Sequence, residues 1–335
     1  MTSYTIRSAH AEAAVVDEAA MLALCVFTLP DGRRFTPFAP APWVGHSDLD
    51  PALSPYLRHL AAEFVCVPFG IGAYALDGSA EEWRDVPIEF HRVPEHGFTA
   101  GGCWSIVAQS KSSIKLRLDF PVDHPIAWAE RTVTLDQQSA AIDFVLSIHS
   151  RRSSRQPIAV HPIFRLPESP GMLKICAVFR QGFTDPGASP AGAEALIPFQ
   201  PFFSLDAIPL LAGGVADYTS FPHAKPIEAM LHLSGAQGAF ELAYPAESAG
   251  VRLTWDREIL PDCLMWASDG MFAPQLGVPP IRCIALEPMV AAFGLAPEVS
   301  LVPNPLTERG ISTALQLDVA APTVIRYRIE AFKLN

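Results

Sequence analysis

Three side chains of this sequence stand in contexts that suit the transfer of protons near neutral pH. They are His96, which a glycine follows, His161, which a proline follows, and Glu287, which ends an apolar run before another proline. Two imidazoles and one carboxylate suffice to take a proton from one oxygen of a small hydroxylated substrate and to deliver a proton to another. The same three groups can also bind a metal ion, so the residue types alone leave two chemistries open.

The residues around these side chains indicate where each one lies. Gly97 allows a sharp turn that would leave His96 at the entrance of a strand. Pro162 keeps His161 in an extended conformation within an apolar stretch. Glu287 lies at the mouth of a predicted strand, where partial burial would raise its pKa toward that of a useful base. Each also has an ordinary explanation: a surface histidine, a core histidine and an exposed glutamate at a strand end.

The composition limits the possible partners and locations of the protein. Half of the 335 residues are hydrophobic and 18% are charged, which is enough to bury a large core. The net charge of −11 disfavours nucleic acids and anionic membranes as partners. No apolar run approaches the roughly 20 residues that cross a bilayer. Acidic residues, and not a basic leader, precede the apolar stretch at 19–27, so we expect a cytoplasmic protein. We expect the six scattered cysteines to be small buried hydrophobes.

Alternation of apolar and polar residues dominates the sequence and predicts strands with one wet face. The clearest cases are residues 114–120, 251–256 and 325–330. Weaker candidates are residues 141–148, 231–234, 240–244, 263–267 and 283–286. The best predicted helix spans residues 56–64, with Ser54 as its N-cap and Pro55 in its first turn.

These patterns predict an all-β protein, a large antiparallel β-sandwich with few short helices. We expect a single domain over residues 1–335, because no linker, repeat or change of composition divides the chain. The segment 183–198, rich in proline, glycine and alanine, is interpreted as a long loop over a binding face.

Four stretches, in this order, resemble segments of the aldose 1-epimerase (mutarotase) family, which has the galactose mutarotase-like fold. They are residues 63–70 (EFVCVPFG), 95–98 (EHGF) with Trp104, 161–166 (HPIFRL), and 260–266 (LPDCLMW) followed by 286–288 (LEP). The resemblance implies a β-sandwich whose concave face binds one sugar. It also implies that Glu287 is the general base at the anomeric hydroxyl, that His161 is the general acid at the ring oxygen, and that His96 orients or polarises that oxygen.

The resemblance further implies an isomerase that needs neither a cofactor nor a metal, with a small-molecule sugar as its partner. A sugar site requires an aromatic face for the ring and polar groups for the hydroxyls. Trp266 and Phe69 are the candidates for the aromatic face. Asp262 is the candidate for binding hydroxyls, although an aspartate at that position could equally cap a loop.

The sequence also departs from the pattern of that family. Residues 69–72 lack the arginine that usually follows the early Pro-Phe-Gly turn, and Arg84 and Arg92 are the candidates to replace it. Val160 stands where an asparagine is typical, and Ile163 where an aromatic residue is common. Two alternatives therefore remain: a non-catalytic carbohydrate-binding protein on the same fold, and a cupin-like metal enzyme, although the closely spaced His-x-His of cupin sites is missing.

Overall fold

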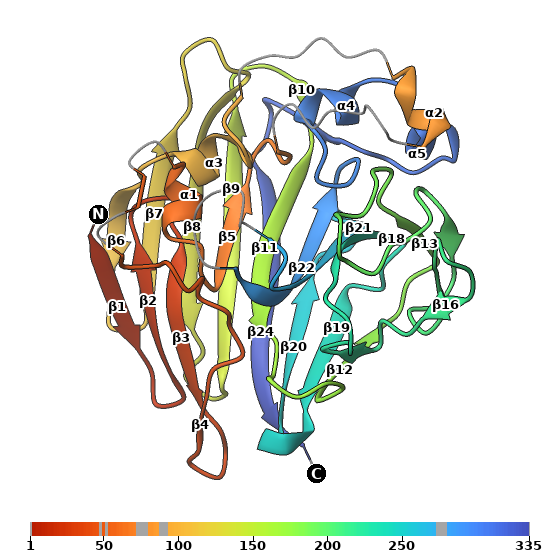
Figure 1. The fold of residues 1–335 in the computed structure, drawn as a ribbon. Helices are drawn as coiled ribbons and strands as arrows, with labels where there is room; N and C mark the ends of the chain where they lie inside the picture. The colour runs from red at the N-terminus through yellow and green to blue at the C-terminus, as the bar shows by residue number, and fades with distance from the viewer. Residues whose placement is uncertain are drawn as a thin grey trace.

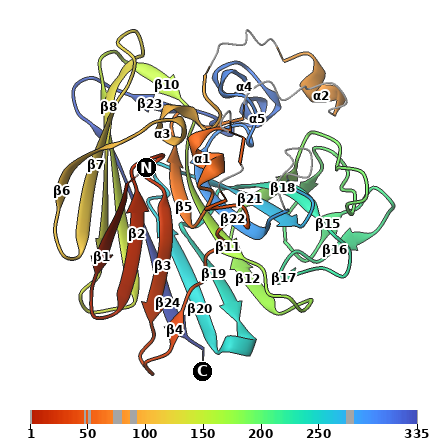
Figure 2. The same cartoon turned by 60° about the vertical axis from the view of Figure 1, so that its left-hand side comes forward.

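The computed structural model describes residues 2–46, 49–50, 53–71, 80–86, 93–272 and 280–334. Within these residues, two large antiparallel sheets of eleven and nine strands pack against each other (Figures 1 and 2). The eleven-stranded sheet has the order β1 (Ser3–Arg7), β2 (Ala11–Val16), β3 (Leu22–Thr28), β5 (Glu63–Cys66), β11 (Ile158–Arg165), β22 (Arg282–Val290), β21 (Asp262–Asp269), β18 (Glu228–Ser234), β13 (Gln181–Thr184), β14 (Pro201–Phe202), with β4 (Arg34–Phe35) paired to β3.

The second large sheet has nine strands. Its order is β17 (Ser220–Phe221), β12 (Leu173–Ala177), β19 (Ala239–Tyr244), β20 (Ala249–Trp255), β24 (Thr323–Lys333), β9 (Ala141–Ser150), β8 (Ile126–Leu135), β7 (Ser113–Asp119) and β6 (Ser105–Gln109). Two small pairs complete the described strands: β10 (Ser154–Gln156) with β23 (Leu315–Leu317), and β15 (Ile208–Pro209) with β16 (Val215–Ala216).

The helices of the described residues are all short. They are α1 (Pro55–Arg58), α2 (Glu81–Arg84), α3 (Gly97–Gly101), α4 (Pro297–Leu301), α5 (Pro305–Glu308) and one 3₁₀ turn, Pro245–Glu247. No helix among them is both long and apolar enough to cross a membrane. The predicted all-β antiparallel sandwich with few short helices is confirmed, and all eight strand segments predicted from the sequence overlap observed strands. The single-domain assignment stays a prediction.

The helix predicted over residues 56–64 is wrong in its length. It begins at Pro55 as expected but ends at Arg58, and the side chain of Ser54 makes no capping hydrogen bond. Residues 60–67 are apolar apart from Glu63, and every residue of β5 is buried. A segment that is buried on both faces is more stable as a central strand than as a one-sided surface helix.

The prediction that the cysteines are buried is right for four of the six. All six cysteines are free, and Cys25, Cys66, Cys263 and Cys283 are buried. The other two, Cys103 and Cys176, are exposed.

A fully buried polar cluster connects the two sheets. Arg131 of β8 forms an ion pair with Glu63 of β5, and the hydroxyl of Tyr327 on β24 donates a hydrogen bond of 2.5 Å to the same carboxylate. Arg131 also donates to the backbone oxygen of Ala20 at 2.8 Å. Because the guanidinium and the carboxylate neutralise each other, the ion pair can be buried between the sheets, where it links β5 to β8.

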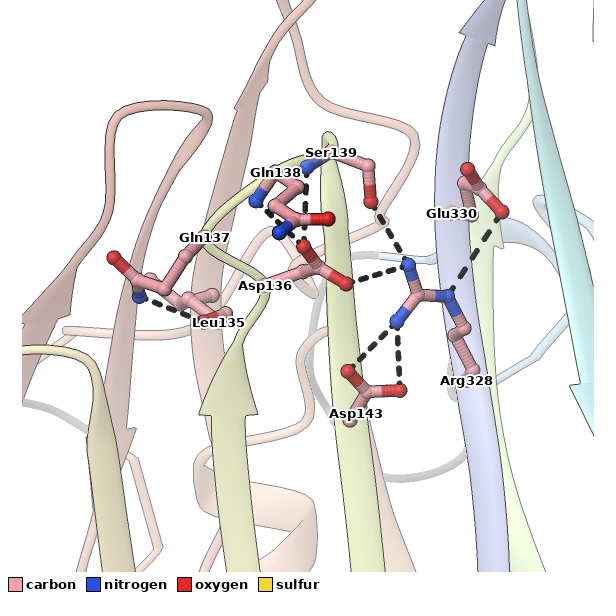
Figure 3. Close-up of polar contacts among 8 residues, drawn as sticks. All are labelled: Leu135, Asp136, Gln137, Gln138, Ser139, Asp143, Arg328 and Glu330. Carbon is pink, nitrogen blue, oxygen red and sulfur yellow. Dashed lines mark hydrogen bonds and ion pairs between the residues drawn. The ribbon is translucent and has the colours of Figure 1, made fainter.

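A second polar cluster fastens the outer face of the nine-stranded sheet (Figure 3). Arg328 of β24 donates to both carboxylate oxygens of Asp143 on β9, at 2.9 and 2.7 Å, and to Asp136 and Ser139, each at 2.8 Å. The Oε2 atom of Glu330 lies 3.8 Å from Arg328 Nε. The guanidinium thus ties β24 to the connection between β8 and β9.

Candidate functional site

The centre of the eleven-stranded sheet brings His161 and Glu287 together. They lie on the neighbouring strands β11 and β22, whose register pairs Ala159 with Met289 and Ile163 with Ala285. His161 Nε2 is 3.4 Å from Glu287 Oε1. The two side chains are buried, with exposed fractions of 5% and 2%. Among the described residues, His161 Nδ1 and Glu287 Oε2 have no hydrogen-bond partner.

Strand β5, the other neighbour of β11, supplies an aromatic ring that packs on the imidazole of His161. In the register of β5 and β11, Phe64 lies opposite His161, and the two rings stack with centroids 4.5 Å apart and planes 20° apart. An apolar ring on one side of the imidazole leaves its edge as the route for proton transfer.

His96 reaches the same place from a different element. It precedes α3, its backbone N–H donates to the oxygen of Gly70 at 2.8 Å, and its ring centroid lies 5.5 Å from that of His161. Its Nδ1 is 3.7 Å from the sulfur of Cys66. The three side chains predicted to handle protons therefore lie together in the structure.

Gly97 explains why the chain can deliver His96 there. Its φ is +80°, and a Cβ atom would lie 2.2 Å from the carbonyl carbon of Val67 and 2.4 Å from the oxygen of Pro68. Only glycine permits such a close approach to the end of β5. The His-Gly pair seen in the sequence is therefore a packing requirement of this corner.

A cavity of about 390 Å³ opens over this cluster. That volume lies within the usual range of small-molecule sites. Trp266 and Phe69, the predicted aromatic residues, both line it, as do His96, His161 and Glu287. The loop after β13 contributes residues 187–190 to the wall, which agrees with the prediction of a loop over a binding face.

Asp262 does not line this cavity. Its Oδ2 atom is 2.9 Å from His232 Nε2, and its Oδ1 accepts the backbone N–H of Gly235 at 2.9 Å. Both side chains of this pair are buried. The carboxylate is thus used inside the protein, and its proposed contact with a sugar hydroxyl finds no support in this geometry.

Sequence reasoning missed the other carboxyl groups of the cavity. Glu228, Asp185 and Glu95 line it, and Tyr56 donates a hydrogen bond of 2.9 Å to Glu95. Glu228 begins β18 and Asp185 directly follows β13. Glu287 was singled out because it closes an apolar run, and neither Asp185, which follows Gln-Gly-Phe-Thr, nor Glu228, which starts a strand, shows that pattern. The expected position of Glu287 at the mouth of a strand is itself wrong, because the residue lies inside β22 and is buried.

Glu228 is held firmly at the wall of the cavity. Its carboxylate accepts hydrogen bonds from Trp266 Nε1 at 2.5 Å and from Ser268 Oγ at 2.6 Å. One edge of Trp266 is thereby fixed, while its ring remains part of the cavity wall. The indole and the carboxylate form one unit, with an aromatic surface beside hydrogen-bond acceptors.

Burial sets the protonation of the cluster. It raises the pKa of Glu287 well above the ordinary value and lowers the pKa of His96 to about 3. The pKa of His161 falls well below its usual range because of burial and, secondarily, the neighbouring imidazole of His96. Burial thus disfavours the charged form of all three groups.

The position of the expected arginine is apolar. Ile71, two residues after Phe69, lines the cavity. Arg84 lies on α2 and is not among the residues that line the cavity, and Arg92 lies outside the described residues. Among the described residues, no cluster of three His, Cys, Asp or Glu side chains is arranged to hold a metal ion, and the cupin-like alternative gains no support from them.

No protein-family model and no curated protein matches the sequence. Solved structures do match it over nearly the whole chain. The fold is the galactose mutarotase-like fold. A galactose mutarotase-like protein from Clostridium acetobutylicum aligns with a TM-score of 0.64 at 13% identity, covering 98% of this chain and 95% of the other. The GalM/aldose epimerase homologue from C. elegans gives a TM-score of 0.64 at 11% identity over 100% of both chains. A galactose mutarotase-like protein from Lactobacillus casei aligns with a TM-score of 0.59 at 14% identity, covering 98% of this chain and 100% of the other.

At these identities the comparisons establish the galactose mutarotase-like fold, and the chemistry of the cavity has to be argued from its own residues.

Proposed function

We propose that the protein is a mutarotase-type isomerase, similar to aldose 1-epimerases, that interconverts the anomers of a sugar. The observation that supports this most is the 3.4 Å separation of His161 Nε2 and Glu287 Oε1 in the cavity, with His96 beside them. The anomeric hydroxyl and the ring oxygen are bonded to the same carbon. An acid and a base that act on both oxygens must therefore lie close together, as these groups do.

The proposed reaction needs one proton removed and one delivered. Glu287 takes the proton of the anomeric hydroxyl, the C1–O5 bond breaks, and His161 gives a proton to the ring oxygen. Rotation about the C1–C2 bond presents the other face of the carbonyl group, and the reverse transfers close the ring. The sugar leaves with the same atoms it brought, and the scheme uses no cofactor.

The directions of these pKa shifts agree with this cycle. In the proposed resting state, Glu287 holds one proton and His161 is neutral. Moving that proton across the 3.4 Å gap produces the carboxylate base and the imidazolium acid without changing the net charge of the cavity. Hydroxyl groups of a bound sugar would stabilise the ionised pair, because they donate to the carboxylate.

The walls of the cavity suit a sugar ring. Trp266 and Phe69 offer apolar faces to the C–H side of the ring, and Glu228 offers acceptors to its hydroxyls. Such a division between an aromatic surface and a few fixed polar groups is typical of small-molecule sites.

Exchange between anomers, followed by NMR or polarimetry over a panel of aldoses, tests the proposal. Glu287→Gln keeps the size of the side chain and removes the base, so we expect the rate to fall by roughly 10²- to 10⁴-fold while the sugar still binds. Glu130→Gln, on the nine-stranded sheet, is the matched control and should keep the wild-type rate. Equal rates for the wild type and Glu287→Gln on every sugar accelerated by the wild type would refute the assignment.

The apolar Ile71 at the expected position of the arginine favours one second candidate, a carbohydrate-binding protein without turnover. Saturable binding of a sugar with no acceleration of anomer exchange would support that candidate instead.

A further inference from the structure

The cavity is rich in carboxyl groups. Glu287, Glu228, Asp185 and Glu95 all line it, and none of its lining residues within the described parts of the chain is a lysine or an arginine. The proposed reaction uses Glu287 alone. The other three carboxyl groups therefore need a different explanation, and Asp185 is the most informative of them.

Asp185 presents an oxygen that has no partner. Its backbone N–H donates to the oxygen of Met230 at 2.9 Å, and its Oδ1 accepts the backbone N–H of Gly187 at 2.7 Å. These two bonds fix the carboxyl group at the wall of the cavity. Its Oδ2 is buried and has no hydrogen-bond partner in the part of the chain that the structure describes. A buried carboxylate oxygen without a donor is costly, so a ligand that supplies a donor there would be strongly favoured.

Glu228 lies on the same side of the cavity as Asp185. Asp185 bonds to Met230 of β18, and Glu228 is two residues before Met230, so both residues project from the same face of that part of the sheet. The bonds from Trp266 and Ser268 take one acceptor site on each oxygen of Glu228. Each carboxylate oxygen has a further lone pair that can accept from a ligand.

We propose that the cavity selects a sugar bearing a protonated amino group, which Asp185 and Glu228 bind while Glu287 and His161 act at the anomeric carbon. This inference rests on the proposed function, because it assumes that the ligand is a sugar. An ammonium group offers three donors and a positive charge, which two carboxylates can satisfy together. A phosphate or carboxylate on the sugar would meet like charge in the same place, so the cavity should reject sugar phosphates and sugar acids.

Calorimetric titration of the full-length protein tests this selection. The ligands are 2-, 3- and 6-amino hexoses, each compared with its parent hexose, and a hexose 6-phosphate. We expect at least one amino hexose to bind at least 10-fold more tightly than its parent, and the phosphate to bind more weakly than either. Asp185→Asn keeps the Oδ1 acceptor for Gly187 and removes the charge. It should lower the affinity for the amino hexose on the order of 10- to 100-fold and the affinity for the parent hexose by less, because a hydroxyl group carries no charge.

The matched control is Asp119→Asn, which makes the same substitution at the exposed end of β7 and should leave the preference intact. A cooperative unfolding transition in urea shows that Asp185→Asn is folded. The inference is overturned if parent hexoses bind as tightly as every amino hexose, if the phosphate binds more tightly, if no sugar binds, or if Asp185→Asn keeps the full preference. If amino hexoses are preferred but no sugar is anomerised faster, the inference stands and the proposed function fails.

Discussion

His161 lies face to face with Phe64, which occupies the opposite position on the neighbouring strand β5. The rings stack at 4.5 Å on the side of the imidazole away from the histidine's nearest acid, Glu287, which comes from the strand β22 on the other side of β11. Three adjacent strands thus supply, in order, the ring of Phe64, the imidazole of His161 and the carboxylate of Glu287. Because strands in a sheet are fixed by their backbone ladders, this order sets the geometry more firmly than loops could.

Replacing Phe64 with leucine should separate the positioning of His161 from the binding of sugar. The substitution removes the stacked ring but keeps an apolar side chain, so we expect the kcat for anomer exchange to fall about 10- to 100-fold. The KM should change little, because Phe64 is not among the residues that line the cavity. Phe38→Leu is the matched control, since Phe38 stacks on Phe164 in the core at 5.7 Å, away from the histidines. A loss confined to KM would contradict the positioning role.

Asp185 should make the stability of the protein depend on pH. Burial raises its pKa from 3.8 to about 6, so the folded state holds this proton more tightly than the unfolded state. The free energy of unfolding therefore decreases as the pH rises from about 4 to about 6, and the full loss is present above that window. The pKa of Glu228, raised by burial to about 7, acts in the same direction.

The substitution Asp185→Asn removes the titrating carboxyl group, and with it the decrease in the free energy of unfolding at high pH. We expect the variant to gain about 1–3 kcal/mol of unfolding free energy over the wild type at pH 8, and almost nothing at pH 4. Urea denaturation at both pH values measures the difference, with Asp119→Asn as the control. A constant difference between the variant and the wild type across this range would show that the Asp185 carboxylate is not destabilised by burial.

The residues that we propose to transfer protons could be located from the sequence because their local patterns are distinctive. His161 lies in an apolar run beside a proline, and Glu287 ends one, so each could be located on a strand without knowledge of its neighbours. Their meeting depends on β11 and β22 being adjacent, although more than a hundred residues separate them in the chain. Periodicity gives no information on pairing over that distance, and the expectation of a shared cavity came from the family resemblance.

Acidic residues at strand ends show where the sequence becomes ambiguous. Asp262 begins β21 and Glu228 begins β18, and the two have similar local sequence contexts. His232, on the strand next to β21, forms a hydrogen bond with the carboxylate of Asp262. Trp266 and Ser268 donate hydrogen bonds to Glu228, which lines the cavity. Which acid faces a ligand is decided by these partners, which lie 30 or more positions away in the chain.

Gly97→Ala should disrupt the corner that carries His96. The added Cβ would meet the backbone of Val67 at 2.2 Å, and backbone atoms of a strand end cannot move aside cheaply. We expect a loss of roughly 3–5 kcal/mol in unfolding free energy. Gly213→Ala provides the comparison, because Gly213 also has a positive φ, +91°, but has no atom within 4 Å of the added Cβ. Its cost should be only the backbone strain of about 1–2 kcal/mol. Equal losses in the two variants would mean that strain, and not the contact with Val67, makes Gly97 necessary.

The buried pair of Arg131 and Glu63 should be far more sensitive to substitution than the partly exposed cluster of Arg328. Arg131→Met leaves the carboxylate of Glu63 between the sheets with only Tyr327 as a donor. An unpaired buried charge typically costs about 3–5 kcal/mol, whereas Arg328→Met on the outer face should cost about 1 kcal/mol or less. Because the unpaired Glu63 can relieve its cost by taking up a proton, the loss in Arg131→Met should be smaller at pH 5 than at pH 8. Adding Glu63→Gln to Arg131→Met should restore part of the stability at pH 8. Chemical denaturation of the wild type, the two arginine variants and the double variant measures these free energies of unfolding. Similar losses of stability in Arg131→Met and Arg328→Met would show that the buried pair does not hold the sheets together.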